Sequence, residues 1–407
     1  MLHTTRKTPL RHTTSTVKAA FTGRLGRLGR LGLLLCALLC ATYLSSLSPA
    51  FAEEITPPEL DIGSYLLEDF QSGERLAEKN ADNRIEPASI TKMMTAYVIY
   101  QTMESGKLKL DDEVLISEKA WQMKGSRMFV KVGSKVPVDK LLSGLVIQSG
   151  NDAAVALAEH IAGTEASFVR RMNETAKEIG MNHTNFENST GWPDPEHYTT
   201  ANDIITLAKR LITDFPQHYQ RYSEKEYTYD GINQRNRNLL LWKDKTVDGI
   251  KTGHTESAGY CLAASAKRNN MRLLTVVLGA SSTQERAAYS QQLLEYGFRF
   301  FETHKIYGGG SVLTEAKVWK GNTDTIPLGI MDDLYVTIHK DRYKHLKGVM
   351  EIDKGIDAPI KRGQVLGKIK ILDNNKAVKE VPLFAMQDIQ EGGFWDRLSD
   401  SFKKFFE

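Results

Sequence analysis

Hydrophobic and polar residues recur with two different periods between residues 53 and about 305, which predicts a mixture of helices and strands. Apolar residues spaced three to four apart predict helices over residues 90–103, 140–146, 152–162, 166–179, 201–213 and 286–301. Shorter segments predict a hairpin over 65–70 and 75–78, and neighbouring antiparallel strands over 247–251, 259–266 and 272–279. We therefore predict an α+β sandwich whose central sheet is antiparallel.

A second pattern follows the triple glycine Gly308–Gly310, which we interpret as a linker. Closely spaced strand patterns at residues 334–339, 365–371 and 377–383 predict a small all-β domain over 309–388.

The carboxyl-terminal residues 392–407 have the pattern of an amphipathic helix. Aromatic and aliphatic residues lie on one helical face and basic residues on the other, namely Phe394, Trp395, Leu398, Phe402, Phe405 and Phe406 against Arg397, Lys403 and Lys404. This pattern is typical of a helix at a membrane interface, where aromatics sit at headgroup depth and lysines meet anionic lipid. The alternative is a helix packed on its own β domain.

The amino terminus resembles an export signal. Residues 1–52 contain seven Lys or Arg and no Asp or Glu, followed by an apolar stretch over 31–44 and by Ala50-Phe51-Ala52, which fits the cleavage rule for signal peptides. We expect residues 1–52 to be removed and the protein to act outside the cytoplasm. The alternative is an uncleaved membrane anchor, for which the apolar stretch is short.

Composition excludes several classes of protein. The chain of 407 residues is 41% hydrophobic and 25% charged, which is the usage of a folded, water-soluble protein. Its net charge of +3 comes from residues 1–52, and the remainder is slightly acidic, so no nucleic-acid partner is expected. Of three cysteines only Cys261 lies beyond the signal, so the mature fold has no internal disulfide.

Ser89-Ile-Thr-Lys92 is the first candidate for chemistry. Side chains at i and i+3 share a helix face, so the Lys92 amine can reach the Ser89 hydroxyl. A serine at a helix amino terminus also has backbone N–H groups nearby for an oxyanion. Alone the pattern is weak, because Ser15–Lys18 and Ser401–Lys404 have the same spacing and an ordinary helix cap explains Ser89.

Two further motifs strengthen the interpretation. Ser149-Gly150-Asn151 falls in a turn between two predicted helices, where polar side chains project into a cleft. Lys251-Thr252-Gly253 falls at the end of a predicted edge strand, where a cation and a hydroxyl face a substrate carboxylate while Gly253 lets another backbone approach. The three together are a far more specific signal than any one of them.

This triple of motifs, with Gly150 in place of the usual Asp, resembles penicillin-binding proteins and class A β-lactamases. With the longer strings that run from Asp248 to Thr255 and from Gly297 to Glu302, the chain resembles the low-molecular-mass penicillin-binding proteins that are D-alanyl-D-alanine carboxypeptidases. The resemblance extends from about Pro57 to the carboxyl terminus.

The resemblance implies a role for each motif residue. The expected nucleophile is Ser89, the base is Lys92, and Ser149 relays a proton to the leaving D-alanine. The expected binding residues are Asn151 for the substrate backbone, Lys251 for positive charge that helps keep Lys92 neutral, Thr252 for the terminal carboxylate, Gly253, His254 through its backbone N–H, and Arg286 beside the carboxylate site. Arg286 has a surface salt bridge as its alternative.

The implied substrate is the D-Ala-D-Ala end of a peptidoglycan pentapeptide, with β-lactams as covalent inhibitors and neither metal nor cofactor. A β-lactamase is the nearest alternative, but residues 182–200 offer Glu187 and Glu196 without the Glu-x-x-Leu-Asn pattern of class A enzymes. A non-catalytic peptidoglycan-binding scaffold is the alternative from another class, and the intact Ser89 and Lys92 argue against it.

Overall fold

The computed structural model describes residues 56–395. The predicted signal peptide lies outside the described residues, as does most of the predicted tail helix, from residue 396 onward. Within 56–395, every helix is too short or too polar to cross a membrane.

A five-stranded antiparallel sheet organises the first part of the chain. Its strand order is β2-β1-β9-β8-β7, so the predicted hairpin and the three later strands belong to one sheet. The amino-terminal strand β1 pairs with β9 along its whole length, a contact between segments about 200 residues apart that local patterning did not predict. The strands are β1 (Ser64–Asp69), β2 (Arg75–Lys79), β7 (Val247–Thr255), β8 (Gly259–Arg268) and β9 (Met271–Ala280).

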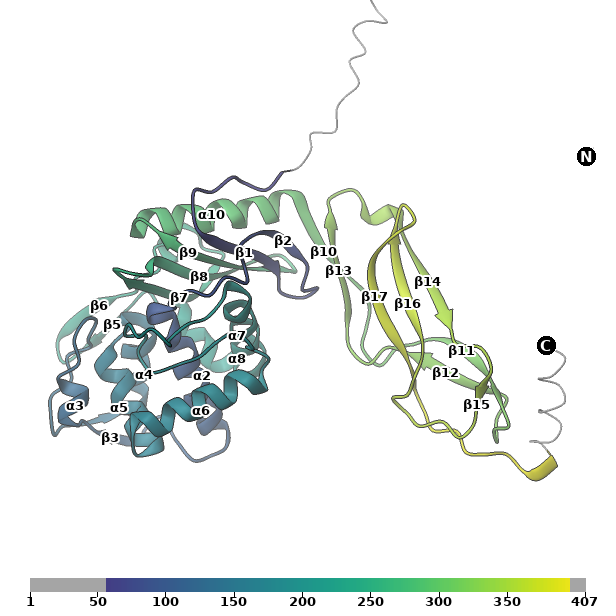
Figure 1. The fold of residues 1–407 in the computed structure, drawn as a ribbon, viewed down its shortest axis with the longest axis horizontal. Coiled ribbons are helices and arrows are strands. Elements are labelled where there is room, and N and C mark those ends of the chain that lie inside the picture. The colour runs from purple at the N-terminus through teal and green to yellow at the C-terminus, as the bar shows by residue number, and fades with distance from the viewer. Residues whose placement is uncertain (1–55, 396–407) are drawn as a thin grey trace, which may run out of the picture. The chain divides into compact units, whose positions relative to one another are not determined.

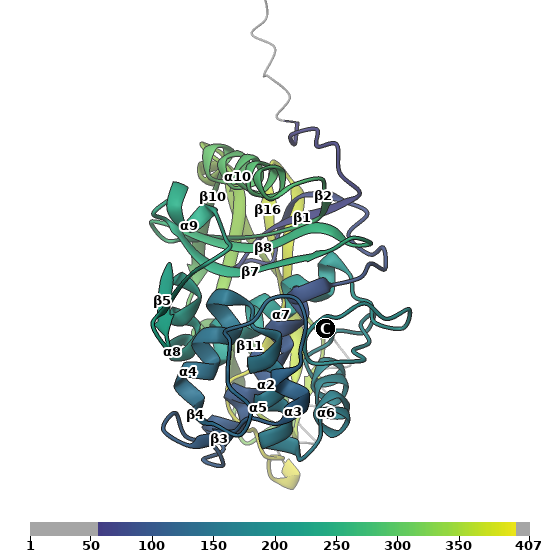
Figure 2. The same cartoon turned by 90° about the vertical axis from the view of Figure 1, so that its left-hand side faces the viewer.

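Helices lie on both sides of this sheet (Figures 1 and 2). Helix α10 (Thr283–Phe300) covers one face, and the remaining helices gather on the other side. They are α2 (Lys92–Glu104), α3 (Glu118–Trp121), α4 (Val138–Ser143), α5 (Asn151–Ala162), α6 (Glu165–Glu178), α7 (Ala201–Asp214), α8 (Pro216–Tyr219) and α9 (Leu240–Lys243), with the short strands β3 (Glu113–Leu115), β4 (Lys135–Pro137), β5 (Glu226–Tyr229) and β6 (Ile232–Arg235). The predicted helices are confirmed to within a few residues at each end.

Helix α2 is the centre of the helical side. Its first nine residues are all buried, and Met93 and Met94 are fully inaccessible. A helix that is apolar on all sides is stable only inside a protein. Lys92, as the first residue of this helix, is therefore carried into the interior, and its side chain is 1% exposed.

Asp152 in α5 stabilises the neighbouring segment that contains Met128 and Phe129. Its carboxylate accepts hydrogen bonds from the backbone N–H groups of Met128 (3.0 Å), Phe129 (2.9 Å) and Ala153 (2.9 Å). The residue is 1% exposed, so removing the carboxylate leaves buried donors without partners. This segment passes directly beside the turn that contains Gly150.

We expect Asp152→Ala to lower the free energy of unfolding by about 3 kcal/mol, because several buried N–H groups lose their acceptor together. Urea unfolding of the mature protein measures this. Glu113→Ala, which removes an exposed carboxylate paired with Lys135, is the matched control and should change stability by less than about 1 kcal/mol. Equal losses in the two variants would contradict the assignment.

The second part of the chain is all β. It contains a six-stranded sheet of order β14-β16-β17-β12-β11-β15 and the separate pair β10–β13. Strand β10 begins directly after α10 and pairs with β13, so the glycines 308–310 lie between β10 and β11 instead of forming the linker that we expected. The strands are β10 (Phe301–Tyr307), β11 (Val312–Trp319), β12 (Thr325–Gly329), β13 (Leu334–His339), β14 (Leu346–Ile352), β15 (Ile356–Asp357), β16 (Val365–Asp373) and β17 (Lys376–Ala385).

Buried polar groups join the end of β1 to β10 and β13. The Ser72 and Thr337 hydroxyls lie 2.6 Å apart, and the Thr303 hydroxyl donates to the Asp69 carboxylate at 2.8 Å. Asp69 is fully buried, and its other oxygen accepts from Ser72. The two parts thus share a hydrogen-bond network that is shielded from water.

Candidate active site

The three motifs meet at one cleft of about 770 Å³. Ser89 lies in the 3₁₀ turn Ala88–Thr91 that leads into α2, Ser149 ends the π-helical turn Gly144–Gln148, and the third motif lies on the edge strand β7. The predicted residues that line the cleft are Ser89, Ser149, Asn151, Thr252, Gly253, His254 and Arg286. The amines of Lys92 and Lys251 reach this group from buried positions behind it.

The Lys92 amine has three hydrogen-bond partners. It lies 3.0 Å from Ser89 Oγ, 2.7 Å from Asn151 Oδ1 and 2.6 Å from the Thr190 carbonyl oxygen. The orientation of the Asn151 amide is set by its Nδ2, which donates to the Lys124 carbonyl at 2.7 Å. Because the Asn151 and Thr190 oxygens can only accept, they take two N–H bonds. The lone pair of a neutral amine is then left for Ser89.

The pKa of Lys92 is lowered to about 7, mainly by burial and also by the charge of Arg237, while the charge of Asp152 opposes the change. Arg237 is a second repelling cation that the sequence did not indicate. The charges of Lys92 and Lys251 also repel each other, and burial lowers the pKa of Lys251 well below its usual range. A lysine whose pKa is near 7 can serve as a base at neutral pH.

Ser149 reaches the cleft through an unusual backbone conformation. It has a left-handed conformation at φ 67° and ψ 36°, and its hydroxyl accepts from Lys251 Nζ at 2.9 Å, while Lys251 also donates to the Thr252 carbonyl at 3.0 Å. The next residue is Gly150, where a Cβ would lie 2.8 Å from the Asp152 carboxylate. A side chain at position 150 would therefore push against this carboxylate.

Strand β7 packs directly on the turn that contains Ser89. It continues to Thr255, so the third motif lies inside the strand and not at its end as predicted. A Cβ at Gly253 would lie 3.0 Å from the Pro87 carbonyl, which shows that the approaching backbone is that of the Ser89 turn. The exposed His254 ring lies 3.9 Å from the Tyr260 ring, between centroids.

Arg286 is 4% exposed and donates to the Gly253 carbonyl at 2.9 Å. The alternative that it forms a surface salt bridge is therefore wrong. Its guanidinium holds β7 and also lines the cleft.

The sequence did not indicate Arg237, which lines the same cleft as Arg286. It lies in the irregular segment between β6 and α9, flanked by the buried side chains of Asn236 and Asn238, where no periodic pattern marks it. The residues that line the cleft include two arginines, Arg237 and Arg286, and a single carboxylate, that of Glu256. The cleft therefore favours an anionic ligand.

The irregular loop of residues 182–200 forms one wall. Thr190, Gly191, Trp192 and Pro193 line the cleft, whereas Glu187 and Glu196 do not. The loop thus places neither of these glutamates where a class A β-lactamase needs its deacylating base. In the described residues no group of three or more His, Cys, Asp or Glu is placed to hold a metal ion.

A family model described as D-alanyl-D-alanine carboxypeptidase matches residues 52–282, and one described as the C-terminal domain of penicillin-binding protein 5 matches residues 301–391. The chain belongs to the D-alanyl-D-alanine carboxypeptidase family. It is a serine-type carboxypeptidase, a hydrolase that removes a terminal D-alanine from D-Ala-D-Ala peptides.

Individual relatives agree with this assignment of the carboxypeptidase. The D-alanyl-D-alanine carboxypeptidase DacA of Escherichia coli is 43% identical over 86% of this chain and 89% of its own length. The DacF enzyme of Bacillus subtilis is 37% identical over 81% of this chain and 86% of its own length.

Solved structures share the fold of the carboxypeptidase. Penicillin-binding protein 5 from Haemophilus influenzae is 41% identical with a TM-score of 0.81, covering 83% of this chain and 99% of its own. Penicillin-binding protein D2 from Listeria monocytogenes, solved in an ampicillin-bound form, is 29% identical with a TM-score of 0.55, covering 59% of this chain and 100% of its own.

Proposed function

We propose that Ser89 is the nucleophile of the carboxypeptidase and that Lys92 is the base that activates it. The observation that carries this proposal is the arrangement of the Lys92 amine, whose two acceptor-only partners leave its lone pair to the Ser89 hydroxyl. The lowered pKa of Lys92 makes the neutral amine available near neutral pH.

The reaction proceeds through an acyl-enzyme. Ser89 attacks the carbonyl between the two D-alanines, and the backbone N–H groups of Ser89 and His254 stabilise the oxyanion. Lys92 takes the proton of Ser89, and Ser149, which is hydrogen-bonded to Lys251, gives its own proton to the departing amine. The proton held by Lys92 then replaces the one that Ser149 has lost. The carbonyl–nitrogen bond breaks, D-alanine leaves, and water then hydrolyses the ester on Ser89. Asn151 holds the substrate backbone as well as the amine of Lys92.

A β-lactam imitates the D-Ala-D-Ala end and acylates Ser89, after which its ring-opened product leaves slowly. Peptide mapping of the penicillin-treated mature protein tests this assignment. The adduct should lie on the peptide that contains Ser89, and an adduct elsewhere would contradict it.

We further propose that the substrate carboxylate binds to the Thr252 hydroxyl within the field of Arg237 and Arg286. All three residues line the cleft, and burial lowers the pKa of Arg286 to about 10 without removing its charge at neutral pH.

We expect Arg237→Ala to lower kcat/KM for a D-Ala-D-Ala peptide by about 10- to 100-fold, since one hydrogen bond to a charged group contributes about 1.5–3 kcal/mol. Steady-state release of D-alanine measures this. The loss should be much smaller for a substrate whose terminal carboxylate is a methyl ester. An equal loss for the acid and the ester would show that Arg237 does not bind the carboxylate.

We also propose that the enzyme is exported and acts on the peptidoglycan side of a membrane, with the tail over 392–407 bound to the lipid surface and the β part as a spacer. The signal-like residues 1–52 and the amphipathic pattern of the tail support this. Cosedimentation of the mature chain with anionic vesicles tests it, because a chain ending at residue 391 should remain in solution. Retention of vesicle binding by the shortened chain would contradict the role of the tail.

A further inference from the structure

The backbone of the loop of residues 182–200 contacts the Lys92 amine and packs on the turn that carries Ser89. The Thr190 carbonyl accepts from Lys92 Nζ at 2.6 Å. The adjacent Gly191, at φ 82°, packs so tightly on the turn before Ser89 that a Cβ would lie 1.7 Å from the Ala88 carbonyl oxygen. A small displacement of this loop therefore moves the amine, the nucleophile or both.

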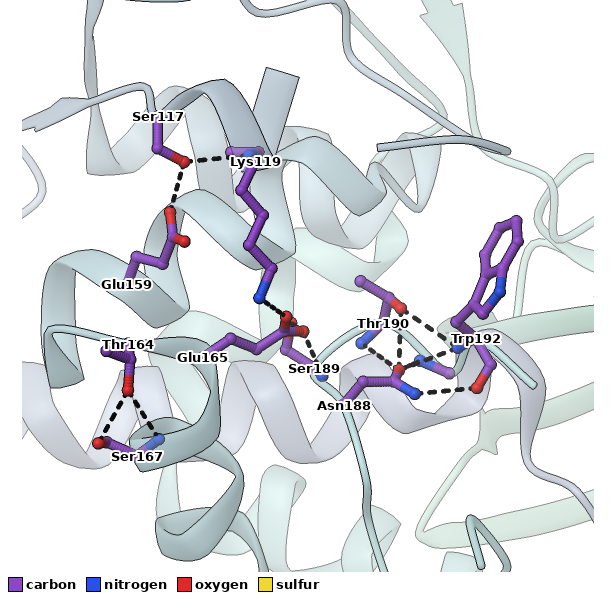
Figure 3. Close-up of polar contacts among 12 residues, drawn as sticks. Ser117, Lys119, Glu159, Thr164, Glu165, Ser167, Asn188, Ser189, Thr190 and Trp192 are labelled. Carbon is purple, nitrogen blue, oxygen red and sulfur yellow. Dashed lines mark hydrogen bonds and ion pairs between the residues drawn. The ribbon is translucent and has the colours of Figure 1, made fainter. Parts of the chain in front are cut away.

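Asn188 holds the loop in place (Figure 3). Its Oδ1 accepts from the backbone N–H groups of Thr190 (3.1 Å), Gly191 (2.8 Å) and Trp192 (2.9 Å), and from the Thr190 hydroxyl at 2.9 Å. Its Nδ2 donates to the Trp192 carbonyl at 2.9 Å. One amide side chain thus satisfies three successive residues in a segment that forms no helix or strand.

Glu165, the first residue of α6, binds Ser189, the residue before Thr190. One carboxylate oxygen accepts from the Ser189 backbone N–H at 3.0 Å and from its hydroxyl at 2.7 Å, and the other lies 2.7 Å from Lys119 Nζ (Figure 3). Burial would raise the pKa of Glu165, but the hydrogen bonds from Lys119 and Ser189 outweigh it and lower the pKa below its usual value. The contact to Ser189 is therefore a charge-assisted one.

A third contact ties the same residue to the helix of the base. Thr95, one turn after Lys92 in α2, donates its hydroxyl to the Ser189 carbonyl at 2.7 Å, and both residues are fully buried. The loop is thus fixed on both sides of Thr190, by Asn188 within the loop and by α2 and α6 at Ser189.

We propose that Asn188 and Glu165 are positioning residues for proton transfer from Ser89, acting by fixing the Thr190 carbonyl that orients the Lys92 amine. The inference rests on the proposed role of Lys92 as the base. Neither positioning residue lines the cleft or contacts Ser89, so both act through the loop.

The physical reason is that base catalysis depends on angle as well as distance. When the Thr190 carbonyl is fixed, one N–H of the neutral amine is committed to it and the lone pair is held toward Ser89. A misplacement of about 1 Å at such a site can cost about 100-fold in rate. A loosened loop also admits water beside Lys92, whose pKa is lowered mainly by burial.

Asn188→Ala tests the proposal through the rate of acylation by penicillin, followed as adduct formation in a single turnover from pH 5 to pH 10. We expect the rate to fall by about 30- to 100-fold and the pH midpoint, near 7 in the parent, to rise by about one unit as water reaches Lys92. Asn188→Asp keeps an oxygen that can accept the same bonds, so it should recover most of the rate at pH 9.

Asn185→Ala is the matched control. It removes the same type of side chain from the same loop, where it contacts Glu187 and the Glu196 carbonyl but none of residues 189–192. We expect it to keep the rate and midpoint of the parent. Glu165→Gln should show a smaller loss, about three- to tenfold, with its midpoint moved in the same direction as in Asn188→Ala.

If Asn188→Ala has the pH midpoint of the parent, the proposal is overturned. An unchanged rate would then mean that Asn188 has no role in the reaction. A lower rate together with a lower melting temperature would mean that its role is purely structural. The companion variant Lys92→Met separates this outcome from a failure of the base assignment. If Lys92→Met acylated at the parent rate, Lys92 would not be the base and the positioning role would fail with it. If Lys92→Met showed no acylation while Asn188→Ala kept the pH midpoint of the parent, only the positioning role would be overturned.

Discussion

Ser89→Ala should release no measurable D-alanine from a D-Ala-D-Ala peptide, a loss of at least about 10⁴-fold, and should form no penicillin adduct. The substitution removes the oxygen that carries the acyl group. It adds no atoms, so it creates no clash with the Lys92 amine, which contacts this side chain in the parent. Stability should change by less than about 1 kcal/mol, because only a partly buried hydroxyl is lost. A D-alanine release assay measures the first effect, and intact mass after penicillin treatment measures adduct formation.

Ser223→Ala is the matched control, since it removes a hydroxyl from an exposed turn where its partner is the Gln220 carbonyl. It should behave as the parent in both assays. Retained release by Ser89→Ala would show that another group is the nucleophile. Loss of release in both variants would point instead to a fault in folding.

Lys92→Met should lower the acylation rate by at least about 10³-fold, because Ser89 then lacks a base within hydrogen-bond distance. In the parent, the rate should rise about tenfold per pH unit below pH 7 and level off above it. The sign follows from the neutral amine being the active form, and its fraction increases as pH rises through the pKa of Lys92, about 7. Penicillin acylation rates across pH measure both effects.

Arg237→Ala tests whether the pH midpoint reports the pKa of Lys92. The charge of Arg237 lowers the pKa of Lys92, so its removal should move the midpoint upward without abolishing acylation. A parent rate that is constant between pH 5 and pH 9 would contradict the assignment of Lys92 as the titrating base.

Much of the local structure follows from sequence pattern. The hairpin at β1 and β2, the strands β7 to β9 and the main helices were predicted within a few residues, because apolar spacing of two or of three to four specifies a face over a short stretch. The hydrogen bond between Lys92 and Ser89 also follows from spacing, since residues three apart share a helix face. The other two motifs were also found in the sequence, and the family resemblance supplied the expected role of each of their residues.

Other features depend on contacts between distant segments. The pairing of β1 with β9, the place of Gly308–Gly310 and the role of Gly150 beside Asp152 were not predictable from neighbouring residues. Asn188 and Glu165 had no motif to mark them, because their importance comes from the single carbonyl that they help to hold.

By itself the sequence determined the order of helices and strands and the candidates for the reactive side chains, since each element and each motif consists of residues close together in the chain. Only the tertiary structure decided which charges act on those side chains. The pKa of Lys92 depends on its burial in α2 and on Arg237, which lies 145 positions away. Burial and Coulomb interactions depend on distance in space, and no local pattern of residues specifies that distance.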